Sequence, residues 1–263
     1  MLDEKRMNRV LEKLDTDQML ITDPCAIFYL TGRWIFAGER FLGLLIKKGQ
    51  KPILYLNELF RFDEELGVTK KMITDTDSVA ELLKCDVDPN KALGVDKTLA
   101  ARFLLPMIDG AIASKFINGS LAVDHTRAIK DEEEIALLRE SSRINDLAMA
   151  EFKKLPKAGM TEIEIANQML DIYKKLGAEA YSFSPIVAFG VNAADPHHMP
   201  DETVLHEGEA VLFDVGCKYH EYCSDMTRTF FFKGTPTDEQ MRIYNLVRQA
   251  NEDAEAYVKP GVR

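Results

Sequence analysis

The sequence predicts two domains of mixed helices and strands, an α/β domain over residues 1–127 and an α+β domain over residues 128–263. Three observations support this division. Short apolar runs alternate with helical patterns in the first half, a run of acids opens a long helical pattern near the middle, and the second half places a β-hairpin between capped helices. At 263 residues, the chain is long enough for one large or two medium domains.

Composition argues for an ordinary globular protein that binds neither nucleic acid nor a membrane. Hydrophobic residues make up 46% of the chain and the formal net charge is -10, whereas nucleic-acid binding needs clustered Lys and Arg. No run approaches the roughly 18 apolar residues of a membrane span. The charged N-terminus leads into an amphipathic helix and not into an apolar signal core, so we expect a cytoplasmic protein. The 4 cysteines are scattered, which predicts reduced thiols.

The first domain is predicted to be a sheet covered by helices. Helical periodicity over residues 3–14 precedes a series of short apolar strands, and alternating strands and helices are typical of a layered sheet. Nothing in this half has catalytic spacing. The predicted strands are residues 19–22, 26–30, 41–46, 53–56, 72–74 and 94–96, and the further helices are residues 78–83 and 99–105.

The second domain is predicted to open with a long helix. Four acids at residues 131–134 stand where the helix dipole favours negative charge, and apolar residues keep a helical period until Pro156. Further on, Ser or Thr followed by Glu or Gln three residues later marks two more helix starts. The remaining predicted elements are a helix from Thr161 to Gly177, a strand over residues 181–190, a loop over residues 191–200, a hairpin, and a helix from Thr237 to Val258.

The predicted hairpin, residues 211–232, carries one aspartate in each arm. If the chain turns at Tyr219 and His220, Asp214 lies directly opposite Asp225 on the polar face. Like charges at that spacing, about 4.5–5.5 Å between Cβ atoms, destabilise a sheet. A shared proton or bound divalent cations would neutralise them. The alternative is a register shifted by one or two residues, with both aspartates solvated.

Two other groups of side chains have the chemistry of a site. Cys217, His220 and Cys223 form a C-x-x-H-x-x-C run that could hold zinc, but they would have to converge across one tight turn and recruit a fourth ligand. His197 and His198 are adjacent. On an extended segment they point to opposite sides, so at most one faces a given site, and we expect His198 to be solvated.

The hairpin residues resemble a known family signature. Residues 208–216 followed by 222–229 resemble the metal-binding signature of Xaa-Pro dipeptidases (prolidases) and Xaa-Pro aminopeptidases, the pita-bread metallopeptidases. Residues 27–32 and 39–46 are similar to the N-terminal domain that prolidases share with creatinase, and residues 128–135 are similar to the start of the catalytic domain. The resemblance implies a creatinase/prolidase-like N-terminal domain followed by the first half of a pita-bread domain.

The resemblance also implies roles for particular residues. Asp214 and Asp225 would be ligands of two divalent metal ions, with manganese expected first and cobalt or zinc as alternatives. His197 would be the catalytic residue that hydrogen-bonds the substrate. Phe183 would line the pocket for the proline ring, and Thr227 would tune the site without binding metal.

The implied activity is metal-dependent hydrolysis of Xaa-Pro dipeptides or short peptides by a homodimer. The family's further metal ligands, one His and two Glu, have no match among these 263 residues, so we expect a fragment that is inactive by itself. Three alternatives stay open: an Xaa-Pro aminopeptidase, a metal-free relative such as creatinase, and a binding or dimerisation module without catalysis.

Overall fold

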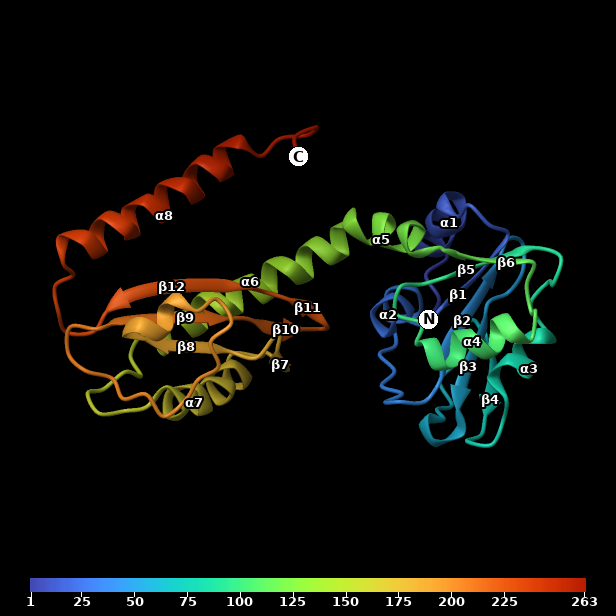
Figure 1. Ribbon diagram of the computed structural model, residues 1–263, viewed down its shortest axis with the longest axis horizontal. Coiled ribbons are helices and arrows are strands. Elements are labelled where there is room, and N and C mark those ends of the chain that lie inside the picture. Colours follow the sequence, from blue (N-terminus) through green and yellow to red (C-terminus); the bar gives the residue numbers. More distant parts are fainter. The chain divides into compact units, whose positions relative to one another are not determined.

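The computed structural model describes every residue from Met1 to Arg263. They form two compact units, Met1–Ile129 and Lys130–Arg263, whose elements are labelled in Figure 1. Each unit has its own buried hydrophobic residues. None of the helices combines the length and the apolar character needed to cross a membrane.

A six-stranded sheet forms the centre of the first unit, with the strands in the order β4-β3-β2-β1-β5-β6. β2 is antiparallel to both β1 and β3, whereas the outer neighbours β3-β4, β1-β5 and β5-β6 are parallel. The strands are β1 (Gln18–Ile21), β2 (Leu42–Lys47), β3 (Ile53–Asn57), β4 (Thr69–Ile73), β5 (Ala92–Val95) and β6 (Lys115–Asn118).

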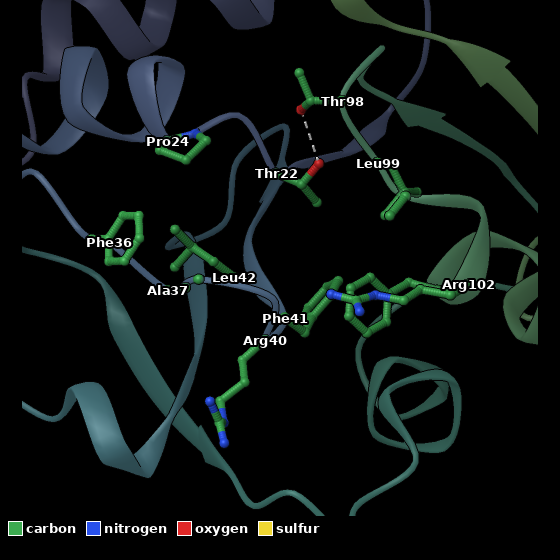
Figure 2. Close-up of a pocket in the computed structure, with 13 residues that line it drawn as sticks. Thr22, Pro24, Phe36, Ala37, Arg40, Phe41, Leu42, Thr98, Leu99 and Arg102 are labelled. Atoms are coloured by element: carbon green, nitrogen blue, oxygen red, sulfur yellow. Dashed lines mark hydrogen bonds between the residues drawn. The ribbon is translucent and has the colours of Figure 1, made fainter.

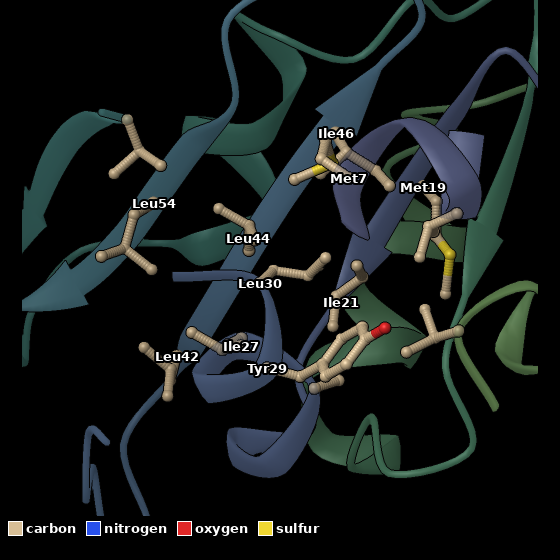
Figure 3. Packing of buried hydrophobic residues seen from close by; sticks show 14 of the residues in the cluster. Met7, Met19, Ile21, Ile27, Tyr29, Leu30, Leu42, Leu44, Ile46 and Leu54 are labelled. Atoms are coloured by element: carbon tan, nitrogen blue, oxygen red, sulfur yellow. The ribbon is translucent and has the colours of Figure 1, made fainter. Parts of the chain in front are cut away.

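Helices cover both faces of this sheet, as predicted. Successive side chains of a strand alternate between faces, so Met19 and Ile21 pack in one hydrophobic cluster and Leu20 packs in the other. Figure 3 shows the first cluster, in which Met7, Ile27 and Leu30 come from helices. That side is covered by α1 (Glu4–Lys13), α2 (Pro24–Thr31) and α5 (Ser120–Ala128), and the other side by α3 (Val79–Lys84) and α4 (Ala101–Asp109).

The predicted strand at residues 26–30 is wrong, because this segment belongs to helix α2. The Asp23 side chain accepts a hydrogen bond from the Cys25 amide, Pro24 lies in the first turn, and Gly32 ends the helix with a φ of 71°. The helix has only 8 residues and is buried on several sides, so its apolar run lacks a helical period. The sequence patterns also predict neither β6 nor α5.

In the second unit, two helices pack against one face of a small antiparallel sheet. On the central strand Val211, Phe213 and Val215 are buried against these helices, and Asp214 lies on the opposite face. The sheet has the order β12-β9-β8 and a second sheet the order β11-β10-β7. The elements are α6 (Glu132–Phe152), α7 (Glu162–Lys175), β7 (Ala180–Tyr181), β8 (Ile186–Phe189), β9 (Ala210–Val215), β10 (Cys217–Tyr219), β11 (Tyr222–Cys223), β12 (Met226–Phe231) and α8 (Asp238–Tyr257).

Capping boxes start all three long helices of this unit. The side chains of Asp131, Thr161 and Thr237 each accept a hydrogen bond from the backbone three residues on, and the acid or amide there bonds back. The predicted starts at these residues are therefore confirmed. The predicted strand at residues 181–190 is only partly right, because four residues separate β7 from β8.

Candidate metal and substrate site

The hairpin that carries the two aspartates pairs two residues away from the predicted register. Thr227, and not Asp225, lies opposite Asp214, and the two-residue turn consists of His220 and Glu221. Both turn residues have positive φ angles, 48° and 65°, as a type I′ hairpin turn requires. The predicted turn one residue earlier is wrong, because neither turn residue is the Gly or Asn that usually marks such a turn.

An even shift leaves both aspartates on the same face of the sheet. Asp225 lies directly before β12, two residues before Thr227, and its carboxyl group contacts that of Asp214. The Thr227 hydroxyl donates a hydrogen bond of 2.9 Å to Asp214 Oδ1. Partial burial, the charge of Asp214 and a hydrogen bond with it raise the pKa of Asp225 above its usual value. Two carboxyl groups in this contact favour a shared proton or a bound cation.

A close backbone crossing places Asp225 in this position. Gly216 lies between β9 and β10, and a Cβ atom there would be 2.0 Å from the carbonyl oxygen of Ser224 and 2.2 Å from Ser182 Oγ. The Ser182 hydroxyl donates to that same carbonyl at 2.8 Å. The chain can therefore cross directly before Asp225 only because residue 216 has no side chain.

Buried polar groups of α6 and α7 hold the hairpin from its core side. Asn145 Nδ2 donates to the Val215 carbonyl at 3.1 Å, and Tyr173 donates its hydroxyl to Asn145 Oδ1 at 2.6 Å. The Ser141 hydroxyl donates to the Cys217 carbonyl at 3.1 Å. Burial raises the pKa of Tyr173 far above its usual value, so its hydroxyl stays protonated as a donor. These bonds fix the strand that carries Asp214.

Cys217, His220 and Cys223 do not converge into a zinc site. Cys217 is buried, with its sulfur 3.6 Å from the Ser141 carbonyl oxygen. Cys223 is exposed, and His220 Nδ1 lies 3.6 Å from Glu179 Oε1. The side chains diverge around the turn, which removes this alternative.

Phe183 and His197 lie in the segments on either side of β8. Phe183 is half-buried and follows Ser182, the residue that contacts the hairpin crossing. His197 is exposed, and its amide donates to Asp195 Oδ1 at 3.0 Å. The His197 ring makes no hydrogen bond with either hairpin aspartate. The structure thus brings Thr227 and the two aspartates together and places His197 on a separate loop.

His198 is not solvated, contrary to the prediction. Its side chain is 12% exposed, and its Nε2 lies 2.6 Å from Oε2 of Glu162, which has no exposure. No sequence motif marks Glu162 as part of a site, because an acid at the start of a helix is ordinary there. Ligand atoms of Glu162, His198 and Asp201 all lie within 4.8 Å of one another, so this group is a second candidate for a metal.

The hydrogen bonds of Glu162 argue against a cation in that group. Oε1 accepts from the Phe189 amide at 2.8 Å and from Asn192 Nδ2 at 3.1 Å, and Oε2 accepts from the Asp201 amide at 3.1 Å besides the His198 contact. Four partners use the lone pairs of both oxygens. A cation would have to displace existing hydrogen bonds, so the hairpin aspartates are the better cation site.

The first unit contains a hollow of about 250 Å³, which Figure 2 shows from close by. Its walls are mainly apolar residues with two threonines and two arginines, and no carboxylate or imidazole lines it. Arg40 at its edge is bound to Asp75 through hydrogen bonds of 2.8 and 3.0 Å. This hollow therefore lacks the groups for acid–base or metal chemistry.

Comparison with known proteins identifies both domains as those of a peptidase. Residues 136–263 match the metallopeptidase family M24, and residues 5–129 match the creatinase/prolidase N-terminal domain. The chain belongs to metallopeptidase family M24. An uncharacterized peptidase of Staphylococcus epidermidis is 33% identical over 259 residues, which cover 98% of this chain and 74% of that protein. A Staphylococcus aureus peptidase is 32% identical over 263 residues with the same coverage.

Solved structures of prolidases and related enzymes share the fold. A prolidase from Thermococcus sibiricus aligns with a TM-score of 0.88 at 28% identity, over 100% of this chain and 74% of its own. An Xaa-Pro dipeptidase from Bacillus anthracis gives 0.81 at 28% identity, over 94% and 70%. An X-Pro aminopeptidase from Thermotoga maritima gives 0.78 at 26% identity, over 97% and 73%. The predicted fold class, a creatinase/prolidase-like domain with part of a pita-bread domain, is confirmed.

Proposed function

We propose that this peptidase is a proline dipeptidase, which hydrolyses the Xaa-Pro bond of dipeptides with the help of divalent metal ions. The observation that carries the proposal is the contact between Asp214 and Asp225. Two carboxylates in contact repel each other, and a shared proton or a bound cation would neutralise them. Similar structures described as a prolidase and an Xaa-Pro dipeptidase support the choice of substrate.

Asp214 and Asp225 would hold the metal ions by their hard oxygen ligands. Manganese is proposed first, with cobalt and zinc as alternatives that tolerate the same ligands. Bound divalent ions supply Lewis acidity, which activates water for attack on a peptide carbonyl at neutral pH. Two carboxylates offer at most four oxygens, fewer than a pair of ions needs. We therefore propose that the 263 residues alone are inactive.

The other site residues would orient the aspartates and the substrate. The Thr227 hydroxyl, bound to Asp214 Oδ1, would restrict the rotation of that carboxylate and so orient it toward a cation. His197 would donate a hydrogen bond to the substrate carbonyl oxygen, and Phe183 would pack against the proline ring. We further propose that the enzyme is a cytoplasmic homodimer.

An Xaa-Pro aminopeptidase is the second candidate, favoured by the similarity to the Thermotoga maritima X-Pro aminopeptidase. The two activities differ in the length of the substrate beyond proline. A dipeptidase closes its site after the proline carboxylate, whereas an aminopeptidase leaves room for a longer chain.

The test is the release of products from Xaa-Pro dipeptides and Xaa-Pro-Xaa tripeptides, with and without Mn²⁺. It compares the 263-residue chain with a form extended to the length of the relatives, of which this chain covers 74%. We expect only the extended form to be active, and we expect it to cleave dipeptides but not tripeptides when Mn²⁺ is present. Cleavage of tripeptides would instead favour the aminopeptidase. No cleavage by either form would leave a creatinase-like relative or a binding module.

A further inference from the structure

We propose that Glu162 is a positioning residue that fixes the loop carrying His197 by holding the ring of His198. Residues 190–201 are called the histidine loop here. The role assigned to His197 rests on the proposed function, but the fixing of the loop does not.

Glu162 lies in the first turn of α7, but capping this helix does not require its side chain to be buried. The capping box of α7 is made by Thr161 and Glu164, whose hydrogen bonds satisfy the helix start without the Glu162 side chain. Glu162 instead points inward and has no exposure. A buried carboxylate is costly unless it is fully hydrogen-bonded, so its partners indicate what it is for.

The partners of Glu162 hold the histidine loop at both ends and in the middle. It accepts hydrogen bonds from the amide of Phe189, directly before the loop, and from the amide of Asp201, its last residue. Between them it binds the side chains of Asn192 and His198. The larger apolar side chains of the loop do not anchor it, since Val191 is 88% exposed and Met199 is 62% exposed. One carboxylate therefore ties the start, the middle and the end of the loop to α7.

The local backbone transmits this attachment to His197. The amide of His198 donates to the carbonyl of Asp195 at 3.2 Å, which closes a turn with Pro196 and His197 at its centre. His198 is at the base of the turn with its ring held inside, and His197 is exposed at the tip. The direction of His197 therefore follows from the contact between His198 and Glu162.

Glu162→Gln is the sharpest variant, because it keeps the shape but replaces one acceptor oxygen by an NH₂ donor. That donor would face N–H groups that now donate to Glu162, so the loop would lose one buried acceptor. Glu164→Gln is the matched control. It makes the same charge change two residues along the same helix, at an exposed side chain that Gln can replace in a capping box.

The first readout needs no activity and uses the 263-residue chain. Diethyl pyrocarbonate carbethoxylates accessible imidazole nitrogens, and mass spectrometry assigns the product to each histidine. We expect His197 to react and His198 to be protected in the native protein and in Glu164→Gln. In Glu162→Gln, His198 should lose its protection. Continued protection of His198 in that variant would overturn the proposal.

The second readout is steady-state kinetics on an Xaa-Pro dipeptide with the extended form. Misplacement of a catalytic group by about 1 Å costs roughly 100-fold, so Glu162→Gln should lower kcat/KM by about 10- to 100-fold with unchanged metal content. In a His197→Ala background it should cause no further loss. His198→Gln, whose amide can still donate to Glu162, should retain more activity than His198→Leu.

These readouts separate the two proposals. If no form cleaves Xaa-Pro substrates, the proposed function fails, and the protection of His198 still decides whether Glu162 fixes the loop. If the losses from Glu162→Gln and His197→Ala multiply, Glu162 has only a structural role and the proposal is wrong. Should Glu162→Gln fail to fold, His198→Leu breaks the same contact from the other side, and unchanged amide hydrogen exchange over residues 190–201 would then overturn the proposal.

Discussion

At the level of single residues, Asp225 is expected to lower the stability of the metal-free protein. Its pKa is raised by partial burial and by Asp214, so between the usual and the raised pKa the native state binds more protons than the unfolded state. Stability contributed by this group is therefore lost as the pH rises through that window. A residue suited to bind a cation is, without one, a source of repulsion.

The variant Asp225→Asn tests this cost. In the presence of a chelator at neutral pH, we expect its free energy of unfolding in urea to exceed that of the native protein by roughly 0.2–1 kcal/mol, a small gain because solvent screens an exposed pair. The variant should also lack the fall in stability across the titration window. If Asp225→Asn is less stable than the native protein in the chelator, the two carboxyl groups do not repel each other.

Thr227→Val removes the hydroxyl that binds Asp214 Oδ1 but keeps the shape of the side chain. We expect the affinity for Mn²⁺, measured by calorimetry on the extended form, to fall by about 10- to 100-fold. Thr229→Val is the control, because Thr229 lies on the same strand opposite Leu212, away from the aspartates. Equal affinities in both variants would contradict the role given to Thr227.

The sequence pattern predicts a site at the aspartates and Thr227, but it does not predict their register. The alternation of a strand has a period of two, so a shift of two residues placed Thr227 opposite Asp214, where Asp225 was expected. The register itself depends on His220 and Glu221, which adopt positive φ without the residues that usually signal it. No local sequence pattern predicts the role of Glu162, because its hydrogen-bond partners lie 27 to 39 residues further along the chain and meet it only in the fold.

At the level of elements, the close approach of Gly216, between β9 and β10, to Ser224, between β11 and β12, determines where Asp225 lies. Gly216→Ala would place a Cβ atom 2.0 Å from the Ser224 carbonyl oxygen, so the backbone must move. We expect a loss of about 1–3 kcal/mol of stability in a thermal or urea melt, together with weaker Mn²⁺ binding. Native stability and native binding in this variant would show that the crossing has no role in the site.

The elements that were predicted correctly have local signals. The three long helices of the second unit begin at capping boxes that involve residues three apart, and such pairs are visible in the sequence. Helix α2 and strand β6 are different. Their character is decided by packing against a sheet whose order joins distant segments, and an apolar run of 8 residues suits a buried helix as well as a strand.

At the level of the whole molecule, stability is unevenly distributed over the 263-residue chain. Helix α8 has no buried residue, whereas α6 buries several side chains in the core of the second unit. We expect the amide hydrogens of α8 to exchange much faster than those of α6 in this chain. Hydrogen exchange read by mass spectrometry compares both helices in one experiment. Equal protection would mean that α8 packs against the protein in solution.

The proposed function requires that the two hairpin aspartates bind the metal ions on which peptide hydrolysis depends. It is tested most directly by proline release from an Xaa-Pro dipeptide after dialysis of the extended form against a chelator and again after return of Mn²⁺. We predict loss of activity, recovery with Mn²⁺, and no recovery in Asp214→Asn. Full activity in the chelator, or recovery in Asp214→Asn equal to that of the native protein, would contradict the claim.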